Sequence, residues 1–112
     1  MTPDTLSQTF AALADPTRRE ILARLAKGEA SVNEIAEPFP ITKQAVSKHL
    51  KVLEHAGLIT RGRTAQLRPA RLRGEALRDV AEWVRAYERF WAERFDRIDA
   101  RLQARGKGAA ND

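Results

Sequence analysis

Side chains able to bind nucleic acid recur at helical spacing in residues 41–59. With about 100° between successive residues of a helix, one side carries amide, hydroxyl and charged groups: Lys43, Gln44, Ser47, Lys48, Lys51 and Glu54. The opposite side is mainly apolar and consists of Ala45, Val46, His49, Leu50, Leu53 and Ala56. Amides and cations are the groups that hydrogen-bond to base edges and phosphates. The pattern is therefore typical of a helix that reads DNA.

The residues at both ends of this segment favour the same helix. The hydroxyl of Thr42 can accept a hydrogen bond from a free amide of the first turn. Gly57 is the residue type that the left-handed position after a helix prefers. We therefore predict a helix over residues 43–56.

Positive charge is concentrated in one part of the chain. The whole chain has a formal net charge of +5. Residues 41–73 contain eight cations and one anion, which gives +7 and leaves −2 for the remainder. A localised basic patch predicts a polyanion-binding surface. The alternative, a lysine-rich helix that is merely solvated, is disfavoured because amides and hydroxyls lie among the cations.

Length and composition exclude several functional classes. At 112 residues, with 43% hydrophobic and 31% charged residues, the chain is expected to be one globular domain. The absence of cysteine excludes disulfides, thiolate catalysis and thiolate metal sites. No apolar run approaches the roughly 20 residues that cross a bilayer, and no secretory signal is evident, so we expect a cytoplasmic protein without a membrane partner. We predict that it is not an enzyme, because no phosphate loop or plausible catalytic triad occurs.

Shorter helices are predicted before the polar one. The first follows Asp4, a suitable cap, and has an apolar face made by Leu6, Phe10 and Leu13. The second begins at Pro16 and ends at Gly28. A capping-box pattern at residues 31–34 opens the third. The third helix and the polar helix, joined by a tight connection, predict a helix-turn-helix over residues 31–56.

A small hairpin and a long helix are predicted after Gly57. Segments 58–61 and 66–68 bracket residues 62–65, which suggests a β-hairpin wing within residues 58–72. One helical pattern then runs over residues 75–105, with a stripe of Leu77, Val80, Ala81, Val84, Tyr87, Trp91, Phe95, Ile98 and Leu102. Such a helix spans about 45 Å, so its far end needs another subunit to cover it. Residues 106–112 are expected to be a disordered tail.

With these elements in place, the chain resembles the ArsR-type (SmtB-like) family of small bacterial winged helix-turn-helix repressors. The resemblance covers residues 5–102 and is carried by ALADPTRREILARL and QAVSKHLKVLEHAGLI. It implies a mainly α fold: a winged helix-turn-helix with a small β-hairpin wing and a long C-terminal dimerisation helix. It also implies a homodimer that binds an inverted repeat in double-stranded DNA and blocks transcription.

The resemblance also implies which residues act. The DNA-binding residues would be Thr42, Lys43, Gln44, Ser47, Lys48 and Lys51 on the helix and Arg61, Arg63, Gln66 and Arg68 on the wing. Gln44 is the best candidate for a base contact, because an amide can bond bidentately to adenine, whereas Lys43 or Lys48 could donate to guanine. Ser47, Lys51 and the wing arginines are expected to contact phosphates. The dimer interface would contain Leu6, Phe10, Leu13, Val84, Tyr87, Trp91, Phe95 and Ile98.

Metal sensing, known in this family, is not expected here. Such members use cysteines near the recognition helix, or Asp and His ligands on the C-terminal helix. Here Asp96 and Asp99 are three residues apart, but residues 75–105 contain no histidine, and two carboxylates alone suit zinc poorly. We therefore expect no metal and no cofactor, and the sequence identifies no small-molecule effector.

Three alternatives remain open. His49 lies on the apolar face, which favours a packed histidine over a phosphate contact. The aromatic residues near Tyr87 could line an effector pocket, although a dimer core is the simpler interpretation. The winged helix could also serve as a protein-interaction module without specific DNA binding, which a weak salt dependence of binding would reveal.

Overall fold

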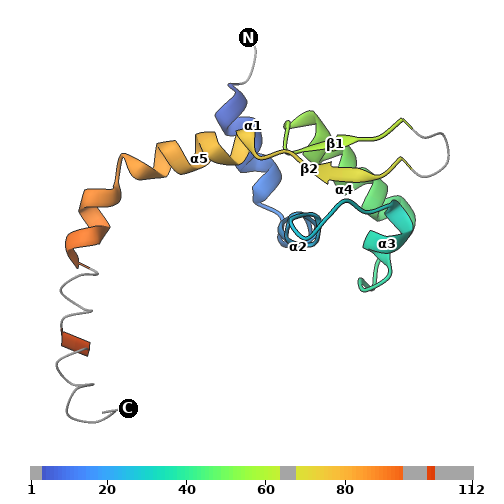
Figure 1. Cartoon of the computed structure of the whole chain (residues 1–112), viewed down its shortest axis with the longest axis horizontal. Helices are drawn as coiled ribbons and strands as arrows, with labels where there is room; N and C mark the ends of the chain where they lie inside the picture. The colour runs from blue at the N-terminus through green and yellow to red at the C-terminus, as the bar shows by residue number, and fades with distance from the viewer. Residues whose placement is uncertain (1–3, 64–67, 95–100, 103–112) are drawn as a thin grey trace. The chain divides into compact units, whose positions relative to one another are not determined.

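The computed structural model describes residues 4–63, 68–94 and 101–102 of the chain (Figure 1). Residues 1–80 and residues 81–112 form two compact units, which we describe separately. The named elements follow in the order α1 (Thr5–Leu13), α2 (Pro16–Leu25), α3 (Val32–Ala36), α4 (Lys43–His55), β1 (Ile59–Arg61), β2 (Ala70–Leu72) and α5 (Glu75–Arg85). The fold is thus mainly helical with a small antiparallel hairpin, as the sequence predicted.

Each of the first four helices begins at a polar side chain that accepts a backbone N–H. Asp4, Asp15 and Thr42 cap α1, α2 and α4, and Ser31 forms the predicted reciprocal capping box with Glu34. These hydrogen bonds satisfy amides that have no partner within the helix. The capping residues therefore fix where α4 and the helices beneath it start.

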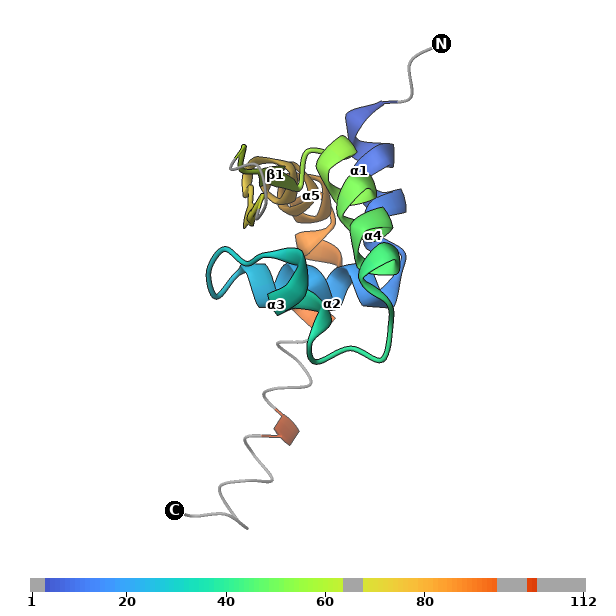
Figure 2. The ribbon, with the colours of Figure 1, turned by 90° about the vertical axis from the view of Figure 1, so that its right-hand side faces the viewer.

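The core of residues 1–80 lies where α4 meets the preceding helices and β1. Figure 2 shows α1 and α4 side by side, with α2 crossing below them. On α4, Val46, Leu50 and Leu53 are fully buried, which confirms the predicted apolar face. Burial of such side chains stabilises the fold by about 1.5–3 kcal/mol each. One side of α4 is therefore packed in the core, and the other side is exposed to solvent.

The inward side of α1 is formed by small side chains. The buried residues are Thr9 and Ala12, whereas Leu6, Phe10 and Leu13 are only partly buried. The small side chains allow α1 to lie close to α2 and α4, and the Thr9 hydroxyl donates to the Thr5 carbonyl at 3.0 Å. Of the larger apolar residues of α1, Leu13 packs against the edge of the core, and Leu6 and Phe10 are partly buried.

The wing also differs in register from the prediction. β2 covers Ala70–Leu72, after Pro69, whereas we expected the second strand at residues 66–68. Arg61 pairs with Ala70, and Ala70 also exchanges two backbone hydrogen bonds with Ala30, at 2.7 and 3.0 Å. Pairing with Ala30, far away in sequence, stabilises the later register. Proline lacks the N–H needed for a central ladder position, so the strand starts after it.

The predicted uninterrupted helix over residues 75–105 is not observed. α5 ends at Arg85, residues 86–87 form a turn, and the chain is helical again over residues 88–94. At the turn, the N–H groups of Ala86 and Tyr87 donate to carbonyls three residues earlier instead of four. Side-chain spacing reports helical periodicity but not such a local tightening of the backbone. Phe95 and Ile98 lie outside the described residues.

Candidate nucleic-acid interface

The polar face of α4 is displayed as the sequence predicted. Lys43, Gln44, Lys48 and Lys51 are exposed, and Ser47 is partly buried. The buried residues on the opposite side hold this face outward. Five groups able to bind phosphates or base edges are thereby presented along one helix.

Thr42 caps α4, as the sequence predicted. Its hydroxyl oxygen accepts the N–H of Ala45 at 3.1 Å and so caps α4. The hydroxyl can still donate a hydrogen bond, because a hydroxyl has one donor besides its acceptor sites. Thr42 is therefore first a residue that positions the helix, and only second a candidate DNA contact.

The wing has fewer available cations than its sequence suggests. Arg71 pairs with Glu29 at 3.4 Å, and Arg73 pairs with Glu75 at 3.2 Å. Arg61 donates from Nε to the Arg68 carbonyl at 2.9 Å. Three of the five arginines between residues 61 and 73 thus have partners within the protein.

The remaining cations lie on α4 and near the wing tip. Within the part of the chain that the structure describes, Lys43, Lys48 and Lys51 make no ion pair, and neither do Arg63 and Arg68. Arg63 and Arg68, which flank residues 64–67 between the two strands, are both exposed. The available positive charge is therefore divided between the polar face of α4 and the wing tip.

Two further details concern the wing. Burial and, to a smaller extent, the charge of Arg68 lower the pKa of Arg61, which has its side chain against the hairpin. Arg68 has a φ of 30°, a positive value uncommon outside glycine, in the segment that connects the strands. Gln66 lies outside the described residues.

His49 links α4 to the start of α2. Its Nδ1 atom lies 3.9 Å from an Asp15 carboxylate oxygen and 3.5 Å from an Arg18 guanidinium nitrogen. The imidazole is partly buried, which fits the packed histidine that we favoured. The N–H of Arg18 and, more weakly, the nearby His49 and Arg18 charges hold the pKa of Asp15 below its ordinary value, despite the opposing effect of burial.

Arg18 was not assigned a role from the sequence. Its Nε donates to the Ala12 carbonyl at 2.7 Å and its Nη2 to the Ala11 carbonyl at 3.1 Å. Arg19 similarly donates to the Leu13 carbonyl at 2.7 Å. Cations placed at a helix C-terminus satisfy carbonyls that have no partner and favour the dipole. The signal was present as two adjacent arginines in the first turn of α2, two and three residues after Pro16.

The described residues contain no group of three or more His, Cys, Asp or Glu side chains placed to hold a metal ion. Asp96 and Asp99 lie outside the described residues. No helix in the described part of the chain is sufficiently long and apolar to cross a membrane.

Comparison with known sequences finds transcription regulators. A helix-turn-helix domain model matches residues 13–62, which extend from the end of α1 to just beyond β1. The transcriptional repressor SdpR of Bacillus subtilis is 37% identical over 79 residues, which cover 70% of this chain and 88% of the repressor.

Comparison with solved structures agrees with these sequence matches. The crystal structure of an ArsR family transcriptional regulator is similar with a TM-score of 0.73 and 35% identity, over 80% of this chain and 98% of the other. The homodimeric winged helix-turn-helix DNA-binding domain of Mb0332 from Mycobacterium bovis gives a TM-score of 0.62 and 30% identity, over 78% and 82% of the two chains.

Proposed function

The chain belongs to the ArsR family of winged helix-turn-helix transcriptional regulators, and we propose that it represses transcription as a homodimer bound to an inverted-repeat operator. Membership of this family makes it a DNA-binding regulator and not an enzyme. The proposal concerns the details: which residues contact DNA, how two copies assemble, and what kind of site they bind. We also propose that it acts on DNA in the bacterial cytoplasm.

The observation that supports the proposal best is the polar face of α4. Gln44 is exposed between lysines that have no ion pair in the described residues, on a helix whose other side is held by the fully buried Val46, Leu50 and Leu53. In our proposal α4 enters the major groove, with Gln44 bonding to an adenine and Lys43 or Lys48 donating to guanine. Thr42, Ser47 and Lys51 contact the flanking phosphates.

The wing supplies a smaller contribution. Arg63 and Arg68 are its exposed cations without an ion pair among the described residues, so they are its main candidate phosphate contacts. Arg61 already donates to the hairpin backbone and would chiefly stiffen the wing. The role of Gln66 remains the one implied by the family resemblance.

Dimerisation would involve apolar side chains that the single chain leaves uncovered. Leu6, Phe10 and Leu13 of α1 are partly buried, and Leu13 packs against the edge of the core. In the other unit, Tyr87 is 51% and Phe90 65% exposed, and Val84 and Trp91 are partly buried. Phe95 and Ile98 complete the proposed interface. Two-fold symmetry would place the two α4 helices about 34 Å apart, in successive major grooves.

Selection of bound sequences from a random DNA pool tests this function. The purified protein is mixed with the pool at near-physiological salt, and the retained DNA is sequenced over several rounds. We expect enrichment of an inverted repeat with half-sites about 10 base pairs apart. The absence of any enriched sequence, with uniform weak binding that disappears as salt rises, would contradict specific recognition.

Titrations of DNA binding at several salt concentrations distinguish this function from the main alternative, a protein-interaction module. DNA binding through several phosphates predicts that log K falls with log salt by about 0.9 for each contact. Five cations of the α4 face and wing tip have no ion pair in the described residues, so the dependence should be steep. A protein-interaction module would bind DNA weakly and without sequence preference.

A further inference from the structure

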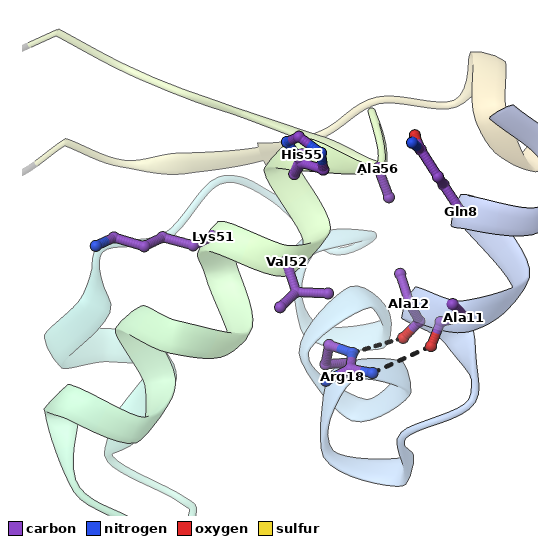
Figure 3. A pocket seen from close by; sticks show the side chains of 8 residues that line it. All are labelled: Gln8, Ala11, Ala12, Arg18, Lys51, Val52, His55 and Ala56. Atoms are coloured by element: carbon purple, nitrogen blue, oxygen red, sulfur yellow. Dashed lines mark hydrogen bonds between the residues drawn. The ribbon is translucent and has the colours of Figure 1, made fainter. Parts of the chain in front are cut away.

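A pocket of about 520 Å³ lies between α1 and α4 (Figure 3). This volume falls within the range of small-molecule sites, about 300–1,000 Å³. α1 contributes Gln8, Ala11 and Ala12, while Val52 and Ala56 lie opposite on α4. Arg18 of α2 lies below them, with its guanidinium against the α1 carbonyls. The pocket is thus lined by both α4, the proposed recognition helix, and the neighbouring α1.

The lining combines an apolar part with basic groups. Val52 is 42% exposed, although it is a large apolar residue, and in Figure 3 its side chain points toward α1. Alanines form much of the remaining surface, so an apolar body could lie between the helices without a clash. Burying Val52 beneath a ligand would remove apolar surface from water and favour binding.

The charged groups of the lining are all potential cations. Arg18, Lys51 and His55 contribute to it, and no Asp or Glu does. Arg18 is held in place by two carbonyls, whereas Lys51 and His55 are exposed on α4. Lys51 extends away from α1 in Figure 3, but its flexible stem allows the ammonium to turn to an anion at the rim. From this lining we propose that the pocket binds a small amphipathic anion, such as an aliphatic carboxylate, and that this binding opposes DNA binding.

The location of the pocket explains why a ligand could reach it in a dimer and why ligand binding would oppose DNA binding. Gln8 and Ala11 lie on the side of α1 roughly opposite Leu6 and Phe10, so a dimer formed through those two residues leaves the pocket open. Lys51 lines the pocket and also belongs to the polar face of α4. An anion that draws Lys51 toward the pocket removes one phosphate contact and reduces the local positive charge. This second half of the proposal depends on the proposed DNA-binding function; the site itself does not.

The site is tested first without DNA, using octanoate as the probe and octan-1-ol as its uncharged match. In methyl NMR spectra of the full chain, octanoate should shift Ala11, Val52 and Ala56. It should bind about tenfold more tightly than octan-1-ol, the ratio expected for one hydrogen bond to a charged group. Equal affinity for the two probes would overturn the requirement for an anion. No shift at millimolar octanoate would overturn the site.

A matched pair of variants locates the binding. Ala11→Phe fills the pocket from an exposed position on α1, and Ala23→Phe places the same ring on an exposed position of α2 outside it. Octanoate should shift the methyl resonances of Val52 and Ala56 in the Ala23→Phe protein as it does in the wild type. It should leave these resonances unchanged in the Ala11→Phe protein. Equal shifts in both variants would place the ligand elsewhere and overturn the proposal.

The coupling is measured last, on the selected operator. Saturating octanoate should weaken operator binding about fivefold or more in the wild type, a usual size for coupling between two sites. The Ala11→Phe variant should bind the operator with wild-type affinity, and octanoate should not change that affinity. Octanoate binding with unchanged operator affinity would overturn the opposition while leaving the site. Failure of the wild type to bind any DNA without octanoate would instead count against the proposed function.

Discussion

The helix α4 and the wing are both rich in basic residues, yet the structure uses these residues differently. On α4, the three lysines make no ion pair among the described residues, and the opposite side is fixed by fully buried Val46, Leu50 and Leu53. In the wing, Arg71 and Arg73 pair with glutamates. The number of cations in a segment therefore overstates what the wing can offer to DNA.

The two regions also differ in how they are anchored. α4 packs on α1, α2, α3 and β1 along its length. The hairpin is anchored only at its base, where Ile59 and Ala70 are buried and the strands contact α4 and α2, whereas Arg63 and Arg68 beyond the base are exposed. A DNA-reading element must be held in one orientation, because base contacts need a fixed geometry. A phosphate-contacting element can tolerate more freedom. The difference in anchoring thus matches the division of labour that we propose.

Truncating the core beneath α4 should have the largest effect. Leu50→Ala removes a fully buried side chain and should lower the free energy of unfolding by about 2–5 kcal/mol. Leu72→Ala, at a partly buried position of β2, should cost clearly less. Urea denaturation of the two variants measures the contrast. Equal losses would mean that the wing is anchored as firmly as α4.

Removing the cap of α4 should have an intermediate effect. Thr42→Ala deletes the hydroxyl that accepts the Ala45 N–H and should cost about 0.5–2 kcal/mol of stability. Thr42→Ser keeps the hydroxyl and serves as the control, with stability close to that of the wild type. If alanine and serine were equally tolerated in thermal unfolding, the capping role would be excluded.

Charge removal should distinguish free cations from paired ones. Lys51→Ala should lower the salt slope of operator binding by about one, as expected for the loss of one phosphate contact. Arg71→Ala should change the slope less, because Arg71 pairs with Glu29. Binding titrations at several salt concentrations measure both slopes. A larger change for Arg71 than for Lys51 would reverse our assignment of available charge.

The smallest effect concerns pH. Hydrogen bonding to the N–H of Arg18 lowers the pKa of Asp15, so the charged carboxylate is favoured in the folded state. The associated stability is present above the unfolded carboxyl pKa of about 4 and is lost as the pH falls through the lower folded value. Asp15→Asn retains a capping oxygen but carries no charge, so it should be somewhat less stable than the wild type at neutral pH and should lose less stability in acid. An unchanged acid dependence in this variant would exclude a contribution from Asp15.

Local rules were sufficient to predict the helices of residues 1–80. The caps at Asp4, Ser31 and Thr42, and the apolar face of α4, each follow from residues within a few positions of one another. The same holds for the exposed polar face, which a helical projection predicts directly. These features depend on local backbone geometry and on one apolar stripe.

Features that depend on distant partners or on the placement of individual side chains were missed. The strand register after Pro69 depends on pairing with Ala30, some 40 residues earlier in the sequence. The ion pairs that engage Arg71 and Arg73 depend on side-chain placement, and so does the role of Arg18 at the end of α1. The turn at residues 86–87 contains no glycine or proline, so the sequence did not indicate it.

The central claim is that α4 determines sequence choice and the wing supplies only general affinity. It is tested most directly by repeating the selection from the random DNA pool with Gln44→Ala and with Arg63→Ala. We expect Gln44→Ala to lose preference at one base pair of each half-site, with a penalty of about 1–3 kcal/mol on the wild-type operator. Arg63→Ala should select the wild-type operator with lower affinity. An altered preference in Arg63→Ala together with an unchanged one in Gln44→Ala would contradict the account.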